Sequence, residues 1–135
     1  MIITLRRFAL IISAAFIALV LTGCRPSVEG TYKGGVLNQS HGVSADLYIT
    51  LTEYNETLSG NMTIGAPLNG GGSVSGRRDG KQIQFVTSDS NGGRISWYGE
   101  VSGRQIEGQY VVEPGGLGAF LAGAEKQQGV WRVKR

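Results

Sequence analysis

Side chains that could carry out chemistry are scarce in this chain of 135 residues, which has one cysteine and one histidine. A single cysteine excludes an internal disulfide and a zinc site built on thiolates, and a single histidine excludes a multi-histidine metal site. His41 lies in a polar segment, residues 38–42, where we expect an exposed turn and a solvated imidazole. Cys24, at the end of an apolar segment, is therefore the residue whose position most strongly suggests chemistry.

Carboxylates, the other common catalytic groups, do not form a recognisable pair. The acids within the expected strands fall mostly on outward positions: Asp46, Glu53, Glu100 and Glu107. In the expected hairpin, Glu100 faces Gln105 and Glu107 faces Tyr98. No carboxylate pair has the apolar setting that separates two pKa values, and no serine or threonine has a recognisable base partner. We therefore expect no enzyme activity, no cofactor and no metal site.

Cys24 ends a segment that is typical of an export signal. Arg6 and Arg7 precede an uncharged, mostly apolar run at residues 8–22, which is shorter than the roughly 20 residues of a membrane-spanning helix. The run ends in Leu21-Thr22-Gly23-Cys24, which resembles the lipobox of bacterial lipoproteins. The resemblance implies transfer of acyl chains such as palmitate to Cys24, cleavage before it, and a membrane as partner through those chains.

This interpretation divides the chain into a signal peptide (1–23, a signal helix), a lipidated tether (24–29) and a barrel domain (30–135). It places the protein in the bacterial cell envelope, and Arg25, in place of an aspartate, resembles lipoproteins sent to the outer membrane of a two-membrane host. Two alternatives stay open: a free thiol after an ordinary secretory signal, and a retained anchor helix.

Charge gives no support for nucleic-acid binding. Loss of Arg6 and Arg7 would lower the 13 basic residues to 11 against 10 acids, a net charge of +1. In the remaining chain no basic run exceeds two residues. The two pairs, Arg77-Arg78 and Lys134-Arg135, are not interleaved with aromatic residues. We expect no nucleic-acid partner.

Apolar residues alternate with polar ones along most of the chain, which is typical of half-buried strands. The alternation predicts eight short strands over residues 30–37, 43–51, 58–64, 74–76, 83–85, 95–101, 106–112 and 131–133. Three two-residue turns would join hairpins at Asn55-Glu56, Asp79-Gly80 and Ser102-Gly103. They predict that Leu51 opposes Gly60, that Gly76 opposes Ile83, and that Gly99 opposes Ile106.

Eight consecutive strands with short connections predict an all-β fold, an eight-stranded antiparallel up-and-down β-barrel with an apolar interior and a polar exterior. Gly30-Thr31-Tyr32 at the start and Gly129-Val130-Trp131 in the last strand are similar to small calycin-like barrels of the avidin and lipocalin kind. Avidin-type biotin sites use several tryptophans, and this chain has only Trp97 and Trp131, so biotin is not predicted.

The barrel interior is the candidate site. Five inward positions are glycine, which either lets strongly coiled strands bend at barrel corners, with Trp97 lying across Gly108, or leaves a cavity: Gly34, Gly60, Gly76, Gly99 and Gly108. The aromatic side chains that would line such a cavity, or simply fill the core, are Tyr32, Phe85, Trp97, Tyr110 and Trp131.

The connection at residues 113–127 is the second candidate feature, because long loops in compact domains often bind ligands or partners. Its glycines surround Leu117, Phe120 and Leu121, which we expect to form a lid, a plug or a partner-binding loop. Two roles follow from these patterns. The first is binding of a small apolar or amphipathic ligand inside the barrel, and the second is an interaction or inhibitor module that holds another envelope protein with a filled barrel.

Overall fold

The computed structural model describes residues 26–88, 92–115 and 126–135. This part of the chain is all-β and contains no helix; its strands are β1 (Gly30–Asn38), β2 (Val43–Tyr54), β3 (Thr57–Ile64), β4 (Gly70–Asp79), β5 (Gln82–Ser88), β6 (Arg94–Ser102), β7 (Gln105–Glu113) and β8 (Gln127–Lys134). Cys24, the expected signal segment at 1–23, and Leu117, Phe120 and Leu121 lie outside the described residues.

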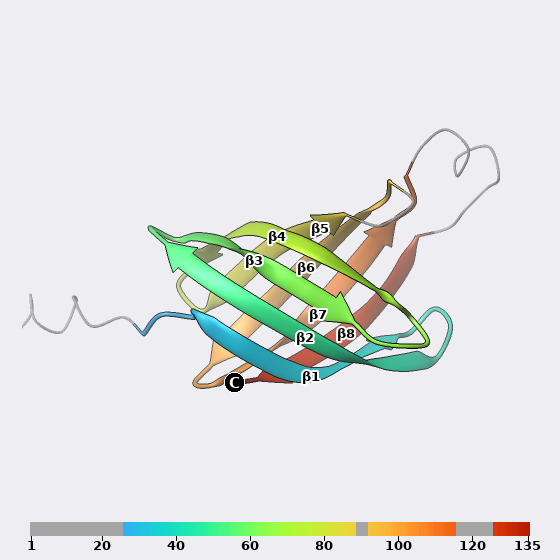
Figure 1. The fold of residues 1–135 in the computed structure, drawn as a ribbon, viewed down its shortest axis with the longest axis horizontal. Coiled ribbons are helices and arrows are strands. Elements are labelled where there is room, and N and C mark those ends of the chain that lie inside the picture. The colour runs from blue at the N-terminus through green and yellow to red at the C-terminus, as the bar shows by residue number, and fades with distance from the viewer. Residues whose placement is uncertain (1–25, 89–91, 116–125) are drawn as a thin grey trace, which may run out of the picture.

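The eight strands form a closed barrel in sequence order (Figure 1). Each strand pairs antiparallel with the next, and β8 closes the barrel against β1, for example with Val36 opposite Trp131. Closure leaves no unpaired strand edge at which another chain could add. The predicted eight-stranded antiparallel up-and-down β-barrel is confirmed.

Inward and outward positions alternate as the sequence pattern predicts. In β2, for example, Leu47, Ile49 and Leu51 are buried, and the residues between them are exposed. The same parity holds in every strand, and the inward residues form one core. Its buried members are Val28, Tyr32, Val36, Leu47, Ile49, Leu51, Leu58, Met62, Val74, Ile83, Phe85, Ile95, Trp97, Ile106, Tyr110, Trp131 and Val133.

The β2–β3 hairpin has the predicted register. Leu51 lies opposite Gly60, and the turn residues Asn55 and Glu56 both have positive φ, 45° and 66°. Positive φ at both central residues is the signature of a type I′ turn, whose twist matches that of the flanking strands.

The predicted registers of the β4–β5 and β6–β7 hairpins are wrong by two residues. Gly76 lies opposite Phe85 instead of Ile83, and Gly99 lies opposite Gly108 instead of Ile106. The turn tips are Gly80-Lys81 and Gly103-Arg104, and in each only the glycine has positive φ, 62° and 61°. A type II′ turn takes glycine at its first central position, so both turns begin one residue later than predicted. Because the slip is two residues, inward side chains stay inward.

The corrected register also changes which residues lie opposite Glu100 and Glu107. Glu100 and Glu107 lie directly opposite each other, contrary to the predicted partners Gln105 and Tyr98. Both are on the outer wall, and Arg132 on β8 binds Glu107 with 2.9 Å between Nη2 and Oε2. Glu53 continues the inward row of β2 and its side chain is only 14% exposed, so its predicted outward position is also wrong.

The inward glycines allow strands to approach closely. A Cβ at four of them would collide with a carbonyl oxygen on the neighbouring strand: Gly34, Gly60, Gly76 and Gly108. A Cβ at Gly99 would lie 2.8 Å from the Trp131 ring. These glycines are therefore needed for close packing, Trp131 and not Trp97 lies opposite Gly108, and none of the five lines the cavity described below.

The two ends of the barrel differ. Tight turns 55–56, 80–81 and 103–104 lie at one end, together with the lead 26–29 and the C-terminus, and we call this the closed end. The other end, where β1, β3, β5 and β7 finish, is the mouth (Figure 1). Among the described residues, no helix is long and apolar enough to cross a membrane.

Candidate ligand pocket at the mouth of the barrel

Four of the five predicted aromatic residues form one cluster in the middle of the barrel. Phe85 stacks on Trp97 with ring centroids 5.9 Å apart, and Tyr110 lies on the other side of the same indole at 5.0 Å. Trp131 meets both Phe85 and Trp97 edge-on at 5.8 Å. These are favourable aromatic geometries, and the four rings form one packed layer contributed by β5, β6, β7 and β8.

Both indole N–H groups are satisfied by the barrel wall. Trp97 Nε1 donates to Thr87 Oγ1 at 3.0 Å, and Trp131 Nε1 donates to the carbonyl oxygens of Tyr98 and Gln109, each at 3.2 Å. Because these polar atoms already have partners, the two tryptophans offer a ligand their ring surfaces and not hydrogen bonds.

Tyr32, the fifth predicted residue, lies away from this cluster at the closed end. Its hydroxyl donates to the Val28 carbonyl oxygen at 2.7 Å, and the Arg135 guanidinium carbon lies 5.8 Å from the ring centroid. Desolvation by burial raises the pKa of Tyr32, and the nearby guanidinium groups of Arg135 and Arg78 oppose that rise. Tyr32 is therefore part of the seal of the closed end.

An ion pair completes that seal. Arg78, only 7% exposed, binds Glu53 with 2.9 Å between Nη1 and Oε1, and the same Nη1 donates to the Pro26 carbonyl oxygen at 2.8 Å. Arg78 Nε donates to the Gly80 carbonyl oxygen at 2.7 Å. Val28 is 1% exposed, so the lead at residues 26–29 packs onto the barrel next to these side chains. Sequence reasoning missed Arg78 as an inward residue, although it continues the row Val74, Gly76.

The mouth half of the barrel is hollow. A cavity of about 510 Å³ opens there, and of the five predicted aromatic residues only Trp97 and Tyr110 line it. Phe85 and Trp131 do not line the cavity but pack against the Trp97 ring. The described lining residues are Val36, Asn38, Ile64, Leu68, Asn69, Gly70, Gly71, Ser88, Ile95, Trp97, Tyr110, Val112 and Gln127. A concave, largely apolar space of this size is typical of small-molecule sites.

Polar groups gather at the rim of this cavity. Asn38, 4% exposed, donates from Nδ2 to Gln127 Oε1 at 2.8 Å, and its Oδ1 accepts the His41 backbone N–H at 3.2 Å. Sequence reasoning missed Asn38 and Gln127. The alternation of inward and outward positions could have found Asn38, because it is the next inward position of β1 after Tyr32, Gly34 and Val36.

The Tyr110 hydroxyl faces this region without a hydrogen-bond partner among the described residues. The residue is 4% exposed, and its hydroxyl lies 2.6 Å from where a Cβ would stand on Gly129. Burial raises the pKa of Tyr110. A neutral hydroxyl with free donor and acceptor capacity beside a cavity is a natural contact for a ligand.

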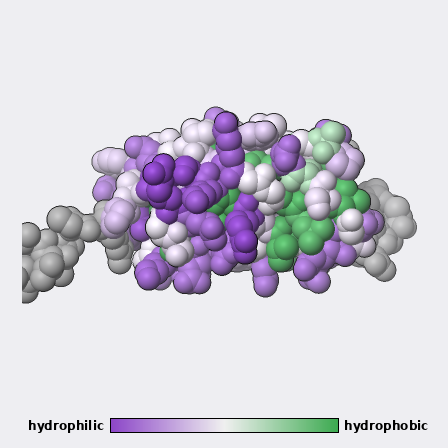
Figure 2. Space-filling model, turned by 90° about the horizontal axis from the view of Figure 1, so that it is seen from below, coloured by the Kyte–Doolittle hydropathy of each residue, from purple (hydrophilic) through white to green (hydrophobic). Residues whose placement is uncertain are grey.

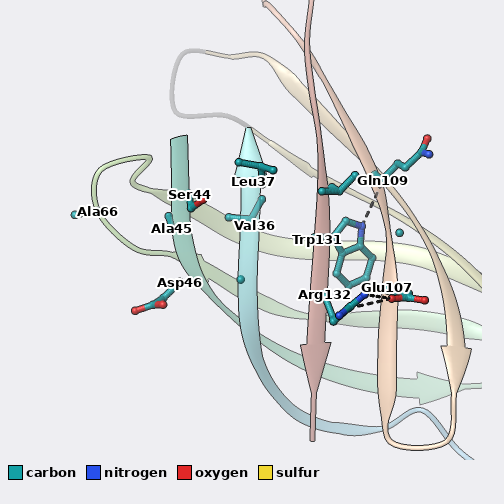
Figure 3. A pocket seen from close by; sticks show the side chains of 13 residues that line it. Val36, Leu37, Ser44, Ala45, Asp46, Ala66, Glu107, Gln109, Trp131 and Arg132 are labelled. Carbon is teal, nitrogen blue, oxygen red and sulfur yellow. Dashed lines mark hydrogen bonds and ion pairs between the residues drawn. The ribbon is translucent and has the colours of Figure 1, made fainter. Parts of the chain in front are cut away.

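The outer wall carries a second, open groove across β2, β1, β8 and β7 (Figure 3). Gly35 lies at the centre of this groove and has no side chain to fill it. Asp46 lies on one side of Gly35, and the Arg132–Glu107 pair lies on the other. Leu37, 36% exposed, and Val130 lie in the next row toward the mouth. In Figure 2 the apolar surface of this face gathers toward the mouth and the hydrophilic surface toward the closed end.

Within the described residues no group of three His, Cys, Asp or Glu side chains could hold a metal ion. Comparison with known proteins gave no match: no family model, no curated protein and no solved structure is significantly similar to this chain.

Proposed function

We propose that this protein is a lipid-anchored lipoprotein of the bacterial cell envelope that binds a small apolar or amphipathic ligand in the mouth of its barrel. The cavity above the aromatic cluster carries this proposal. It combines an indole and a phenol ring with aliphatic walls and a few hydrogen-bonding groups at the rim. That combination supports uptake of a molecule with an apolar body and a polar end.

The filled-barrel alternative applies to only half of the molecule. The closed half is occupied by the aromatic cluster, Tyr32 and the Arg78–Glu53 pair. These groups give the mouth cavity a rigid floor, because the four rings of the cluster are packed on one another and both indole N–H groups are bonded to the barrel wall. A rigid floor below an open cavity favours ligand binding over a purely structural barrel.

Ligand binding is tested by native mass spectrometry of the protein purified from its host's envelope. We expect an extra mass that disappears on denaturation and is distinct from the acyl modification. Trp97→Ala removes a lining ring and should abolish this mass, whereas Ile106→Ala, in the core but away from the cavity lining, should retain it at equal folded population. No extra mass on any folded form would contradict the proposal.

The membrane anchor is tested separately. Acylation at Cys24 would place lipid two residues before Pro26, the first described residue. Cys24→Ser should move the protein from the membrane fraction to the soluble fraction, while Ser27→Cys in the same background should not restore attachment. Retention of the Cys24→Ser variant in membranes would contradict lipidation as the anchor.

The second candidate function is an interaction or inhibitor module, and the outer groove favours it. The groove places apolar Leu37 and Val130 beside the charges of Asp46, Arg132 and Glu107, a mixture found in partner surfaces. Leu37→Asp should then remove a cross-link to an envelope protein, with the exposed Tyr54→Asp as the matched control.

A further inference from the structure

We infer that the mouth cavity selects an uncharged amphiphile, whose apolar part lies on Trp97 and whose hydrogen-bonding end lies at the Asn38–Gln127 rim. This inference rests on the proposed ligand binding and narrows it to a chemical class. It is carried by what lines the cavity and by where the nearby charges lie.

No described residue that lines the cavity is charged: the lining contains neither Asp nor Glu, and neither Lys, Arg nor His. Charged side chains that the structure describes at the ends of the mouth strands lie on the outer surface. Lys126 pairs with Glu113 on the outer surface at 3.6 Å, both side chains being more than half exposed, and Arg94 is exposed at the start of β6. A carboxylate, phosphate or ammonium inside this space would lose its hydration without gaining a counter-charge.

Neutral hydrogen-bonding groups, in contrast, are present and available. Gln127 Oε1 is held by Asn38, which leaves the Gln127 amide N–H₂ without a partner among the described residues. The Tyr110 hydroxyl is likewise without one in this part of the chain, and Ser88 adds a second hydroxyl to the lining. Amide and hydroxyl groups match the carbonyl or hydroxyl of an alcohol, ester or amide, and leave no group buried unpaired once the ligand is in place.

The apolar part of the site lies deeper along the strands. Val36 is two residues below Asn38 on β1, and Trp97 is two residues below Ile95 on β6; all four line the cavity. A ligand that places its polar end at the rim therefore meets aliphatic and aromatic surface below. This order sets both the chemistry and the direction of binding.

The test uses three ten-carbon probes that differ only at one end: 10-bromodecanol, 10-bromodecanoate and 10-bromodecylammonium. The acylated full chain is placed in phosphatidylcholine vesicles at neutral pH, and bromine quenching of tryptophan is measured against free probe, corrected with protein-free vesicles. The only tryptophans are Trp97 and Trp131, so quenching reports on the barrel interior.

We expect the alcohol to bind at least tenfold more tightly than either charged probe. Equal or tighter binding of the decanoate or the ammonium probe overturns the inference while leaving ligand binding intact. Failure of all three probes to quench overturns the proposed ligand binding itself, together with this inference.

Two glutamines supply matched variants for the position of the polar end. Gln127→Glu keeps the oxygen that accepts from Asn38 and adds a negative charge at the rim, so it should raise the affinity for the ammonium probe at least tenfold relative to the alcohol. Gln128→Glu adds the same charge at the next, exposed position of β8 and should leave the ranking unchanged. An unchanged ranking in Gln127→Glu overturns the placement of the polar end at this rim.

Discussion

At the scale of single residues, Arg77 and Arg78 show how position along a strand decides the role of a charge. Arg77 is exposed on the outer wall, whereas Arg78 is buried and binds Glu53 and the Pro26 carbonyl oxygen. Arg78→Met leaves the partly buried Glu53 carboxylate without its counter-charge, so we expect the free energy of unfolding to fall by about 3 kcal/mol or more. Urea unfolding measures the loss. Arg77→Met should change it by less than about 0.5 kcal/mol, and an equal effect of the two substitutions would contradict this role.

The raised pKa of Tyr110 should make the stability of the fold depend on pH in the alkaline range. Its pKa in the folded protein is raised by burial above the ordinary value of 10.0. Below pH 10 the hydroxyl is protonated in both states, and above it the unfolded chain loses the proton first, so stability falls as pH rises through the folded-state pKa. The slope contributed by this group is at most about 1.4 kcal/mol per pH unit. Urea unfolding at pH 8 and pH 11 should show a smaller decline for Tyr110→Phe than for Tyr48→Phe, which changes an exposed tyrosine.

At the scale of elements, the turns decide which residues of two neighbouring strands lie opposite each other, whereas the alternation of apolar and polar residues decides only which side chains point inward. Gly103 begins the β6–β7 turn with φ 61°, and no atom lies within 4 Å of where its Cβ would stand. Gly103→Ala therefore tests backbone strain without a collision, and we expect a loss of about 1–2 kcal/mol in the free energy of unfolding. Gly35→Ala, in an extended strand with only an ordinary contact at 3.6 Å, should cost nothing measurable. Equal losses from both would mean that the turn conformation is not what requires glycine.

These elements also show what the sequence could predict. Period-two alternation was sufficient for the number, order and inward faces of the strands, because burial imposes it directly. The two wrong registers arose because Asp79-Gly80 and Gly80-Lys81 both make acceptable two-residue turns. Glycine has positive φ in either turn, and only the φ of Asp79, which is not positive, distinguishes them. The aromatic cluster could be predicted as a set, but its division into lining and supporting rings depends on that register.

The polar residues that point into the barrel were missed for a different reason. Asn38, Thr87, Arg78 and Glu53 all continue an inward row at the end of a strand, where polar side chains suggest a turn or an outer surface. Extending the inward–outward alternation beyond the last apolar residue of each strand would have placed them inward. Their partners, such as Gln127 for Asn38 and Pro26 for Arg78, come from distant segments, so pairing depends on closure of the barrel.

At the scale of the whole molecule, the lead and the cavity lie at opposite ends of the barrel (Figure 1). Tyr32 and Arg78 hold the lead on the closed end, and Arg135 Nη1 adds a hydrogen bond to the Glu29 carbonyl oxygen at 2.7 Å. The proposed acyl anchor on Cys24, two residues before Pro26, would therefore bring the closed end to the bilayer. The mouth would then face the aqueous side, and a ligand would reach it from there and not directly from the lipid.

Fluorescence energy transfer measures this orientation. His41→Cys puts a thiol in the turn at the mouth, and Arg104→Cys puts one in a turn at the closed end; both side chains are exposed. β1 has nine residues, which at about 3.3 Å per residue and a tilt of about 40° separates the ends by roughly 20 Å. With the chain acylated at Cys24, the introduced thiol carries the donor, and an acceptor lipid marks the vesicle surface. The Arg104→Cys protein should transfer energy much more efficiently than the His41→Cys protein. Equal transfer would mean that the barrel lies on its side, and the reverse order would place the mouth against the membrane, where a ligand could pass straight from the bilayer into the cavity.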